Sequence, residues 1–208
     1  IFLNYVNKAN IKYGGGLVSV NSVTTVYTPI HLDTARPTIT FNTITNSAAA
    51  AVSANPNSFD DSLNRIGPEI HGNLLTNNSI NGINVRIRTL LGKPIDTLDV
   101  NARFDDTDIV HVISENLFIT GSAGGPLNGV PRLSGRLAID PGTVVKLEGS
   151  RIENQIGNAN IIAEGTAERP IIFTSLLDDQ YGVGGTFDTT SNLSAAIATP
   201  GSWGGIFL

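Results

Sequence analysis

The chain has 208 residues, of which 40% are hydrophobic and only 15% are charged, and its formal net charge is -5. This length allows one large domain with a real core, or two small ones. The acidic balance argues against nucleic acids and anionic membrane surfaces as partners. Without cysteine the chain can form neither a disulfide nor a thiolate metal site. No run approaches the roughly 18 consecutive apolar residues that a membrane helix needs, so we expect no membrane span in this segment.

The small number of charged residues is balanced by many Asn, Thr, Ser and Gly residues. This mixture suits strands joined by turns better than helices, because Asn and Gly accept positive φ and Thr fits a pleated surface. The chain begins without an initiator methionine or the features of a signal peptide, so we expect any export signal to lie outside it. The lack of cysteine agrees with a bacterial exported protein.

Short alternating apolar runs predict strands from the first quarter of the chain onward. In "TITFNTIT" (38–45), Ile39, Phe41 and Thr43 share one face of a predicted strand. The best helix candidate is Ser47–Ala54, which is bracketed by Asn and Asn-Pro and is long enough for one or two turns. We find no amphipathic helix of ten or more residues.

The second half of the chain repeats this pattern. In "INVRIRTL" (83–90), Val85 and Ile87 share one face and Arg86 and Arg88 the other. Similar strands are predicted within "DIVHVI" (108–113), "GTVVKLEG" (142–149), "ANIIAEG" (159–165) and "PIIFTS" (170–175).

Strands this short are typical of a β-sandwich or a β-solenoid, and three observations favour the solenoid. Strand–turn units recur at about 20–30 residues, which is a period of repeat architectures. Hairpin signals are scarce, because the Asn-Gly pairs at 81–82 and 128–129 do not lie between two equal alternating runs. Asn pairs four residues apart recur beside strands, and Asn at the corner of one coil can stack on its equivalent in the next. The predicted asparagine ladder consists of Asn42, Asn46, Asn73, Asn77, Asn154 and Asn158.

Several longer motifs resemble those of one protein family. The chain contains a Pro-Gly-Thr-Val-Val-Lys strand, an Ala-x-Gly-Thr turn, a Pro-Ile-x-Phe-Thr-Ser strand and a Gly-x-Trp-x-Gly-Ile segment, together with "YGGG" and "GPEIHGNLLTNNSINGINVRI". They lie at 141–146, 163–166, 170–175, 201–206, 13–16 and 67–87. Together they resemble the repeat region of large exported bacterial surface and fibre proteins. The resemblance implies an all-β, right-handed parallel β-helix of the pectate-lyase-like type, with loop insertions. It says little about activity, because this fold carries lyases, hydrolases, adhesins and inert stalks alike.

The two termini of the chain share a tripeptide. Ile1, Phe2 and Leu3 at the start are repeated as Ile206, Phe207 and Leu208 at the end. In the family, the Trp-containing segment leads directly into the coil that ends in Tyr-Gly-Gly-Gly. We therefore interpret residues 1–208 as a single β-helix unit, one repeat of about 205 residues in a longer tandem or end-to-end stacked array. The alternative is an arbitrary boundary and a coincidence of three residues.

The loop 176–192 is the best metal candidate. Asp178, Asp179 and Asp188 supply carboxylates, and Ca²⁺ takes six to eight oxygen ligands. In the family the corresponding loop is often richer in Asp, so the resemblance implies calcium here. No cofactor is required by any motif. His31, His71 and His111 lie 40 residues apart in unrelated contexts, so we expect no shared metal site.

Other residues have a functional and a structural interpretation. The carboxylate pairs 60–61, 105–106 and 178–179 invite a hydrolase with a general acid and base, but turn capping explains them better. Trp203 offers a stacking surface for a sugar, although the family pattern favours a packed anchor. Arg86 and Arg88 offer contacts to an acidic glycan, although a solvated pair that protects a strand edge is more ordinary.

The sequence thus predicts an extracellular or cell-surface structural protein, not an enzyme, whose partners are identical units placed end to end. Two other functions stay open. A glycan-binding adhesin module would show an outward aromatic and polar groove. A polysaccharide lyase or hydrolase would show at least three converging carboxylates with Arg or Lys on adjacent coils.

Overall fold

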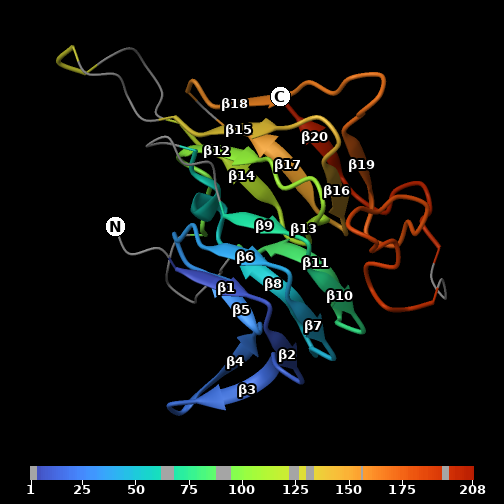
Figure 1. Cartoon of the computed structure of the whole chain (residues 1–208). Helices are drawn as coiled ribbons and strands as arrows, with labels where there is room; N and C mark the ends of the chain where they lie inside the picture. Colours follow the sequence, from blue (N-terminus) through green and yellow to red (C-terminus); the bar gives the residue numbers. More distant parts are fainter. Residues whose placement is uncertain are drawn as a thin grey trace.

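A computed structural model describes residues 4–61, 68–87, 95–121, 127–129, 134–155, 157–193 and 197–208. Apart from one short 3-10 helix, the secondary structure of this part is strand, and the strands stack in parallel as a β-solenoid of about five turns (Figure 1). The predicted parallel β-helix is therefore confirmed.

One sheet runs the whole length of the solenoid, and we call it the spine sheet. Its strands, in spatial order, are β5 (Ile30–Leu32), β8 (Ala50–Ala54), β11 (Ile80–Val85), β13 (His111–Ile113), β16 (Val144–Leu147) and β19 (Ile172–Ser175). All neighbours in it are parallel. Each coil of the chain thus contributes one strand, and successive coils advance along a single axis.

The remaining sheets change halfway along the axis. In the N-terminal half two sheets precede the spine strands, formed by β1 (Tyr5–Asn7), β6 (Thr38–Thr40) and β9 (Glu69–His71), and by β2 (Asn10–Lys12), β7 (Thr43–Thr45) and β10 (Leu74–Thr76). In the C-terminal half one sheet precedes and one follows, formed by β12 (Asn101–Phe104), β15 (Arg136–Ile139) and β18 (Asn160–Ala163), and by β14 (Leu117–Ile119), β17 (Arg151–Asn154) and β20 (Gly205–Phe207). The cross-section therefore differs at the two ends, and only the spine sheet reaches both.

The structure corrects two local predictions. The run 38–45 is two strands, because Phe41 takes φ 55° at a corner, and the bend places Ile39 and Ile44 both inside the solenoid. Ala50–Ala54 forms the buried strand β8 instead of a helical turn. Pairing on both sides with β5 and β11 decides this segment, because tertiary context overrides the helix propensity of alanine. After β8 the 3-10 helix η1 (Pro56–Phe59) inserts Phe59 into the core.

Stacking produces ladders of side chains inside the solenoid. One inward position of the spine sheet is occupied in successive coils by Ile30, Val52, Ile83, His111, Val145 and Phe173. His111 interrupts this aliphatic ladder. Val110 and Val112 lie on the other face of the strand in a separate apolar cluster, as the alternation predicted.

His111 is fully buried, and the backbone of Ile109 is the polar group that acts on its imidazole. Its ring stacks on Phe104 with a centroid separation of 4.4 Å, and neither ring nitrogen has a hydrogen-bond partner among the described residues. Burial lowers the pKa of His111 to about 3, an effect partly offset by the backbone of Ile109. The imidazole is thus neutral at physiological pH.

A true asparagine ladder joins the corners of the first three coils. The Asn42 side chain accepts a hydrogen bond from the Ala9 N–H (2.8 Å) and donates to the carbonyl of Val6 (3.0 Å) and to Asn73 Oδ1 (3.0 Å). Asn73 Nδ2 in turn donates to the carbonyl of Ile39 (2.8 Å). These bonds satisfy backbone groups that the corner removes from the sheets.

Asn46 and Asn77 take φ 58° and 56° at equivalent corners of neighbouring coils, because they follow the paired residues Thr45 and Thr76 of β7 and β10. Asn154 ends β17 and Asn158 lies in the following turn, several coils away. A second corner instead uses Asn78 and Asn81, which were not predicted. Asn78 Oδ1 accepts from the N–H of Ser47 (2.9 Å), and Asn78 Nδ2 donates to Asn81 Oδ1 (3.0 Å).

The sequence analysis missed one hairpin. Strands β3 (Gly16–Val20) and β4 (Val23–Tyr27) are antiparallel and are joined by Asn21 and Ser22, whose φ angles are 49° and 64°. Positive φ at both central positions is the geometry of a tight primed turn, which Asn-Gly serves most often but Asn-Ser serves here. No helix in the described part of the chain is long and apolar enough to cross a membrane.

Replacing His111 tests how much the buried imidazole lowers the free energy of unfolding. We expect His111→Leu to raise the free energy of unfolding at pH 7 by about 1–3 kcal/mol, because it removes an unsatisfied polar group from an apolar ladder. At His111 the folded protein binds fewer protons than the unfolded chain between pH 3 and 6.5, so the contribution of this residue to stability falls as pH drops through this window. The variant should lose this dependence in urea unfolding experiments. His31→Leu is the control and should not stabilise, because His31 Nδ1 is bonded to Ser53 Oγ at 2.8 Å. Destabilisation by His111→Leu would contradict the assignment.

Candidate functional site

The N-terminal end of the solenoid is open. Strands β1, β2 and β5 are the first in their sheets, and each has a described neighbour on one side only. Between β1 and β5 lies an open hollow with an apolar floor that includes Val6, Ile30, Leu32 and Ile39. Unpaired parallel edges around an apolar floor are a surface that another β-coil can cover.

The C-terminal end is open as well. Strands β18, β19 and β20 are the last in their sheets. Ile161, Phe173 and Trp203 are only partly buried against the core at this end, and Phe207 is 49% exposed. Trp203 therefore has the packed position that its structural interpretation predicted.

The predicted assembly residues lie partly at this end. Ile206 pairs with Ile152 in β17, Phe207 lies beneath the Arg151 guanidinium at 5.2 Å, and Leu208 is 90% exposed. Ile1, Phe2 and Leu3 lie outside the described residues, as does Arg88.

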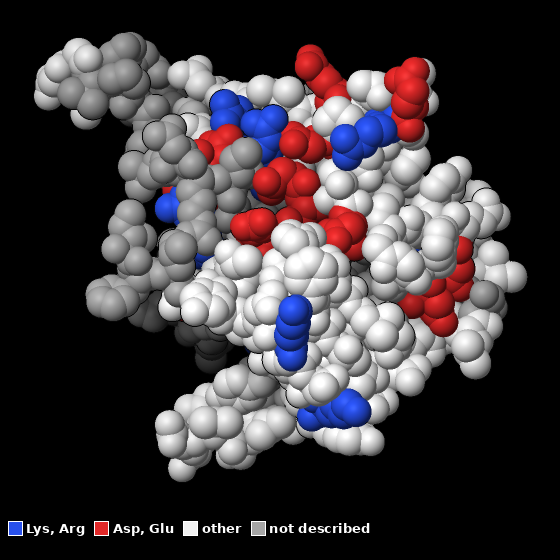
Figure 2. Space-filling view, in the orientation of Figure 1, with Lys and Arg blue, Asp and Glu red and all other residues white. Residues whose placement is uncertain are grey.

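The two ends carry opposite charge. Residues 4–60 contain the basic side chains Lys8, Lys12 and Arg36 and the acidic side chains Asp33 and Asp60, and Arg36 lies 3.9 Å from Asp60. Residues 157–208 contain one basic residue, Arg169, and five acidic ones, which are Glu164, Glu168, Asp178, Asp179 and Asp188. Figure 2 shows the same gradient on one face, with only basic side chains over the lower, N-terminal coils and most acidic ones above. Head-to-tail contact therefore brings complementary potentials together.

The loop 176–192, which was predicted to bind calcium, surrounds the positively charged side chain of Lys146. Lys146 on the outer side of β16 is fully buried beneath this loop, and its Nζ donates to the carbonyl oxygens of Asp178 (2.8 Å) and Phe187 (3.0 Å). Burial lowers the pKa of Lys146, and the nearby carboxylates of Asp179, Asp178 and Asp188 oppose this shift. In the described part of the chain no three His, Asp or Glu side chains are arranged to hold a metal ion. Calcium binding by this loop remains a prediction. The ammonium group of Lys146 lies near the same three carboxylates that were expected to bind the ion.

The aspartates of this loop also fix its shape. Asp178 accepts hydrogen bonds from Thr174 Oγ1 and the Gln180 N–H, and Asp188 accepts from the N–H groups of Asn192 and Leu193. We call this arrangement around Lys146 the lysine latch, because it fastens residues 176–193 onto the outer face of the spine sheet.

Five carboxylates gather where the cross-section changes, and we call them the acidic cluster: Glu69, Asp105, Asp106, Asp108 and Asp140. Asp106 accepts a hydrogen bond from the Ile70 N–H (2.8 Å) and Asp108 from the Gly72 N–H (2.6 Å). These two side chains thus cap the open edge of β9. Burial and the neighbouring carboxylates raise the pKa of Asp106 to about 8 and that of Asp105 to about 6.

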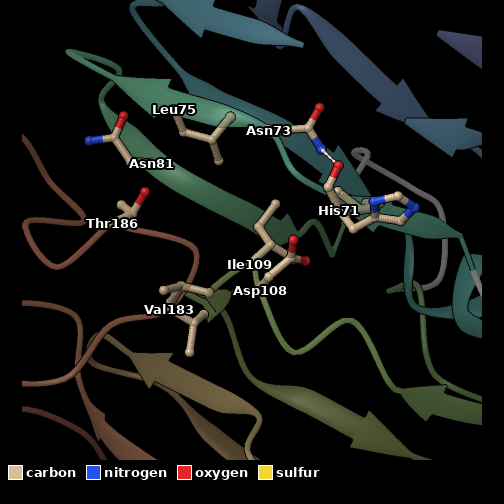
Figure 3. Close-up of a pocket in the computed structure, with 10 residues that line it drawn as sticks. His71, Asn73, Leu75, Asn81, Asp108, Ile109, Val183 and Thr186 are labelled. Atoms are coloured by element: carbon tan, nitrogen blue, oxygen red, sulfur yellow. Dashed lines mark hydrogen bonds between the residues drawn. The ribbon is translucent and has the colours of Figure 1, made fainter. Parts of the chain in front are cut away.

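A narrow crevice lies beside this cluster, between β9, β10 and the latch loop (Figure 3). His71, Asn73 and Asp108 supply its polar lining, with Val183 and Thr186 on the loop side. Its cavity volume of about 10 Å³ is far below the ~300–1,000 Å³ of common ligand sites.

The predicted carboxylate pairs have structural partners. Asp61 forms an ion pair with Arg136 (2.7 Å), and Asp60 lies 3.9 Å from Arg36. Asp105 and Asp106 join the acidic cluster described above. Arg86 donates its backbone N–H to the carbonyl of Ala54 (2.7 Å) where β11 ends.

Sequence reasoning missed Lys146, although a signal existed. Lys146 alternates with Val145 and Leu147, so it points outward, and an outward lysine in an apolar strand is a candidate for burial when a loop rich in Asp follows. Asp106 gave no such signal, because nothing local shows that β9 lies beside it.

Removing the latch cation tests the loop. Without the ammonium of Lys146, two buried carbonyl groups and three carboxylates lose their cationic partner, so we expect Lys146→Met to expose residues 176–193 to limited proteolysis and hydrogen exchange. The exposed Lys12→Met is the control. Millimolar Ca²⁺ should be added to the variant, since restored protection would support a metal-binding capacity of the three aspartates. Unchanged protection without Ca²⁺ would contradict the latch.

The acidic cluster makes stability pH-dependent in the opposite sense to His111. The folded protein retains a proton on Asp106 up to about pH 8, whereas the unfolded chain releases it near pH 4, so the contribution of Asp106 to stability falls as pH rises through this window. One group gives a slope of up to about 1.4 kcal/mol per pH unit. Asp106→Asn keeps an acceptor for Ile70 and should flatten the slope in denaturant unfolding between pH 5 and 8. The exposed Glu164→Gln should leave it unchanged, and an unaltered slope in Asp106→Asn would refute the assignment.

No protein-family model, curated protein or solved structure matches this chain.

Proposed function

We propose that the protein is a structural unit that associates head to tail with identical copies and so builds an extracellular filament, sheath or surface fibre. The observation that carries the proposal is the spine sheet, whose edge strands β5 and β19 have no partner on their outer sides among the described residues. Because all its strands are parallel, a second copy translated along the axis continues the sheet without reversing it. Such heterologous contacts do not close and therefore propagate.

The difference between the two ends gives this contact its specificity. The flanking sheets at the N-terminal end do not have counterparts at the C-terminal end, so only the spine strands can continue in register. Charge supports the same polarity, since Lys8 and Lys12 lie in the first coil and Glu164 and Glu168 follow β18 in the last. Like ends would bring like charges together, which disfavours head-to-head dimers.

Export to a bacterial cell surface and membership of a larger repeat array belong to this proposal. They are supported by the motifs that resemble exported fibre proteins, and the cysteine-free composition is compatible with export. The glycan-binding and hydrolase alternatives are not favoured by any described site. Trp203 packs on the core, and the acidic cluster faces only a small crevice.

Sedimentation velocity and negative-stain microscopy test head-to-tail association. We expect reversible oligomers whose size grows with concentration and falls with added salt, because opposite charges steer the two ends. Lys8→Gln/Lys12→Gln should weaken association several-fold at low salt. The control Thr76→Glu/Ser79→Glu changes net charge equally but on the wall of the solenoid at β10. A protein that stays monomeric at all concentrations would overturn the proposed function.

A further inference from the structure

The hairpin β3–β4 stands apart from the stacked coils. It is inserted in the first coil between β2 and β5, and its strands pack extensively only on each other. Figure 1 shows it extending away from the solenoid on the side of the first coil, beyond β1, β2 and β5. It therefore flanks the open end where a second copy would add.

The hairpin carries an apolar face at its tip. Cross-strand pairing places Val18, Val20 and Val23 on one face, with exposed fractions of 42%, 46% and 59%. Ser19 and Thr24 form the opposite face at the same level, and Leu17 and Val26 continue that face towards the base of the hairpin with exposed fractions of 74% and 46%. Only the tip is therefore apolar on one face alone, and its valine side chains in solvent are arranged for contact with another surface.

The hairpin also lacks the charged residues and prolines that keep ordinary edge strands from pairing with other chains. Residues 13–30 contain no charged side chain, and the hairpin has no proline. A two-stranded hairpin alone is marginally stable in water, and uncharged β-branched edges pair readily with other strands. Such a segment is unfavourable on a monomer and favourable in an interface.

The base of the hairpin is held in place. Gly16 has φ 93°, and a Cβ there would lie 2.8 Å from the Cβ of Ala48. On the other strand, the Thr28 and Ser53 hydroxyl groups are hydrogen-bonded at 2.7 Å. The hairpin is thus a preorganised arm, whose docking requires little further ordering.

We propose that the valine face of the hairpin, formed by Val18, Val20 and Val23, packs against the C-terminal coil of a second copy of this chain. The inference rests on the proposed function, since continuity with the open first coil and the opposite charges of the ends identify the occupant. The C-terminal coil offers exposed apolar side chains, namely Ile162 (42%), Ile206 (37%) and Phe207 (49%). The arm adds a lateral contact to the axial pairing of β19 with β5.

Matched hairpin variants test the arm by sedimentation velocity. Val20→Lys should raise the dissociation constant of self-association at least tenfold, whereas Thr24→Lys, at the same level on the opposite face, should change it less than twofold. Val20→Thr/Val23→Thr keeps β-branched side chains, so the hairpin persists, and it should weaken association several-fold. Circular dichroism and thermal unfolding should show an unchanged solenoid in all three.

The outcomes separate the two proposals. Wild-type association with no loss in either valine variant would overturn the hairpin inference and leave head-to-tail assembly standing. The same result is expected if the hairpin serves a foreign partner. Equal loss in Thr24→Lys and Val20→Lys would refute the assignment to the valine face. A monomeric wild type would overturn both proposals.

Discussion

Parallel hydrogen bonding between successive coils is the constraint on which the rest of this structure depends. Each strand of the spine sheet satisfies its backbone through the coil before and the coil after it, so an internal coil is complete and a terminal coil is not. The interaction that makes the solenoid stable thus leaves β5 and β19 with open edges. Closed folds avoid this problem, whereas a solenoid must cover its ends or extend through them.

The same stacking places polar groups where few proteins would tolerate them. His111 occupies a ladder position between Ile83 and Val145, and Lys146, next in register to Val112, lies beneath the latch loop. Asp106 caps a strand edge where the flanking sheet ends. Their pKa values move in the directions that burial imposes, downward for His111 and Lys146 and upward for Asp106. Lowering the pH therefore reduces the contribution of His111 to stability, whereas raising the pH reduces that of Asp106.

Regularity and interruption have different roles along the chain. Asn42 and Asn73 repeat a corner, and repetition stabilises the stack. The hairpin at 16–27 and the latch loop at 176–193 interrupt the repeat, and both project from the coil as insertions. The repeating elements stabilise the solenoid. The insertions make its two ends and its outer face different from one another.

The sequence by itself determined the fold class and the strand-rich character. These follow from alternation, turn residues and composition, which are local properties. It also located the corner residues Asn42 and Asn73, because coils of similar length repeat them. Only the tertiary structure decided that Ala50–Ala54 is a strand, that Asp106 retains a proton and that Lys146 lies among three aspartates. Each of these depends on which distant segment packs against it, and contacts between residues tens of positions apart are not encoded in any local pattern.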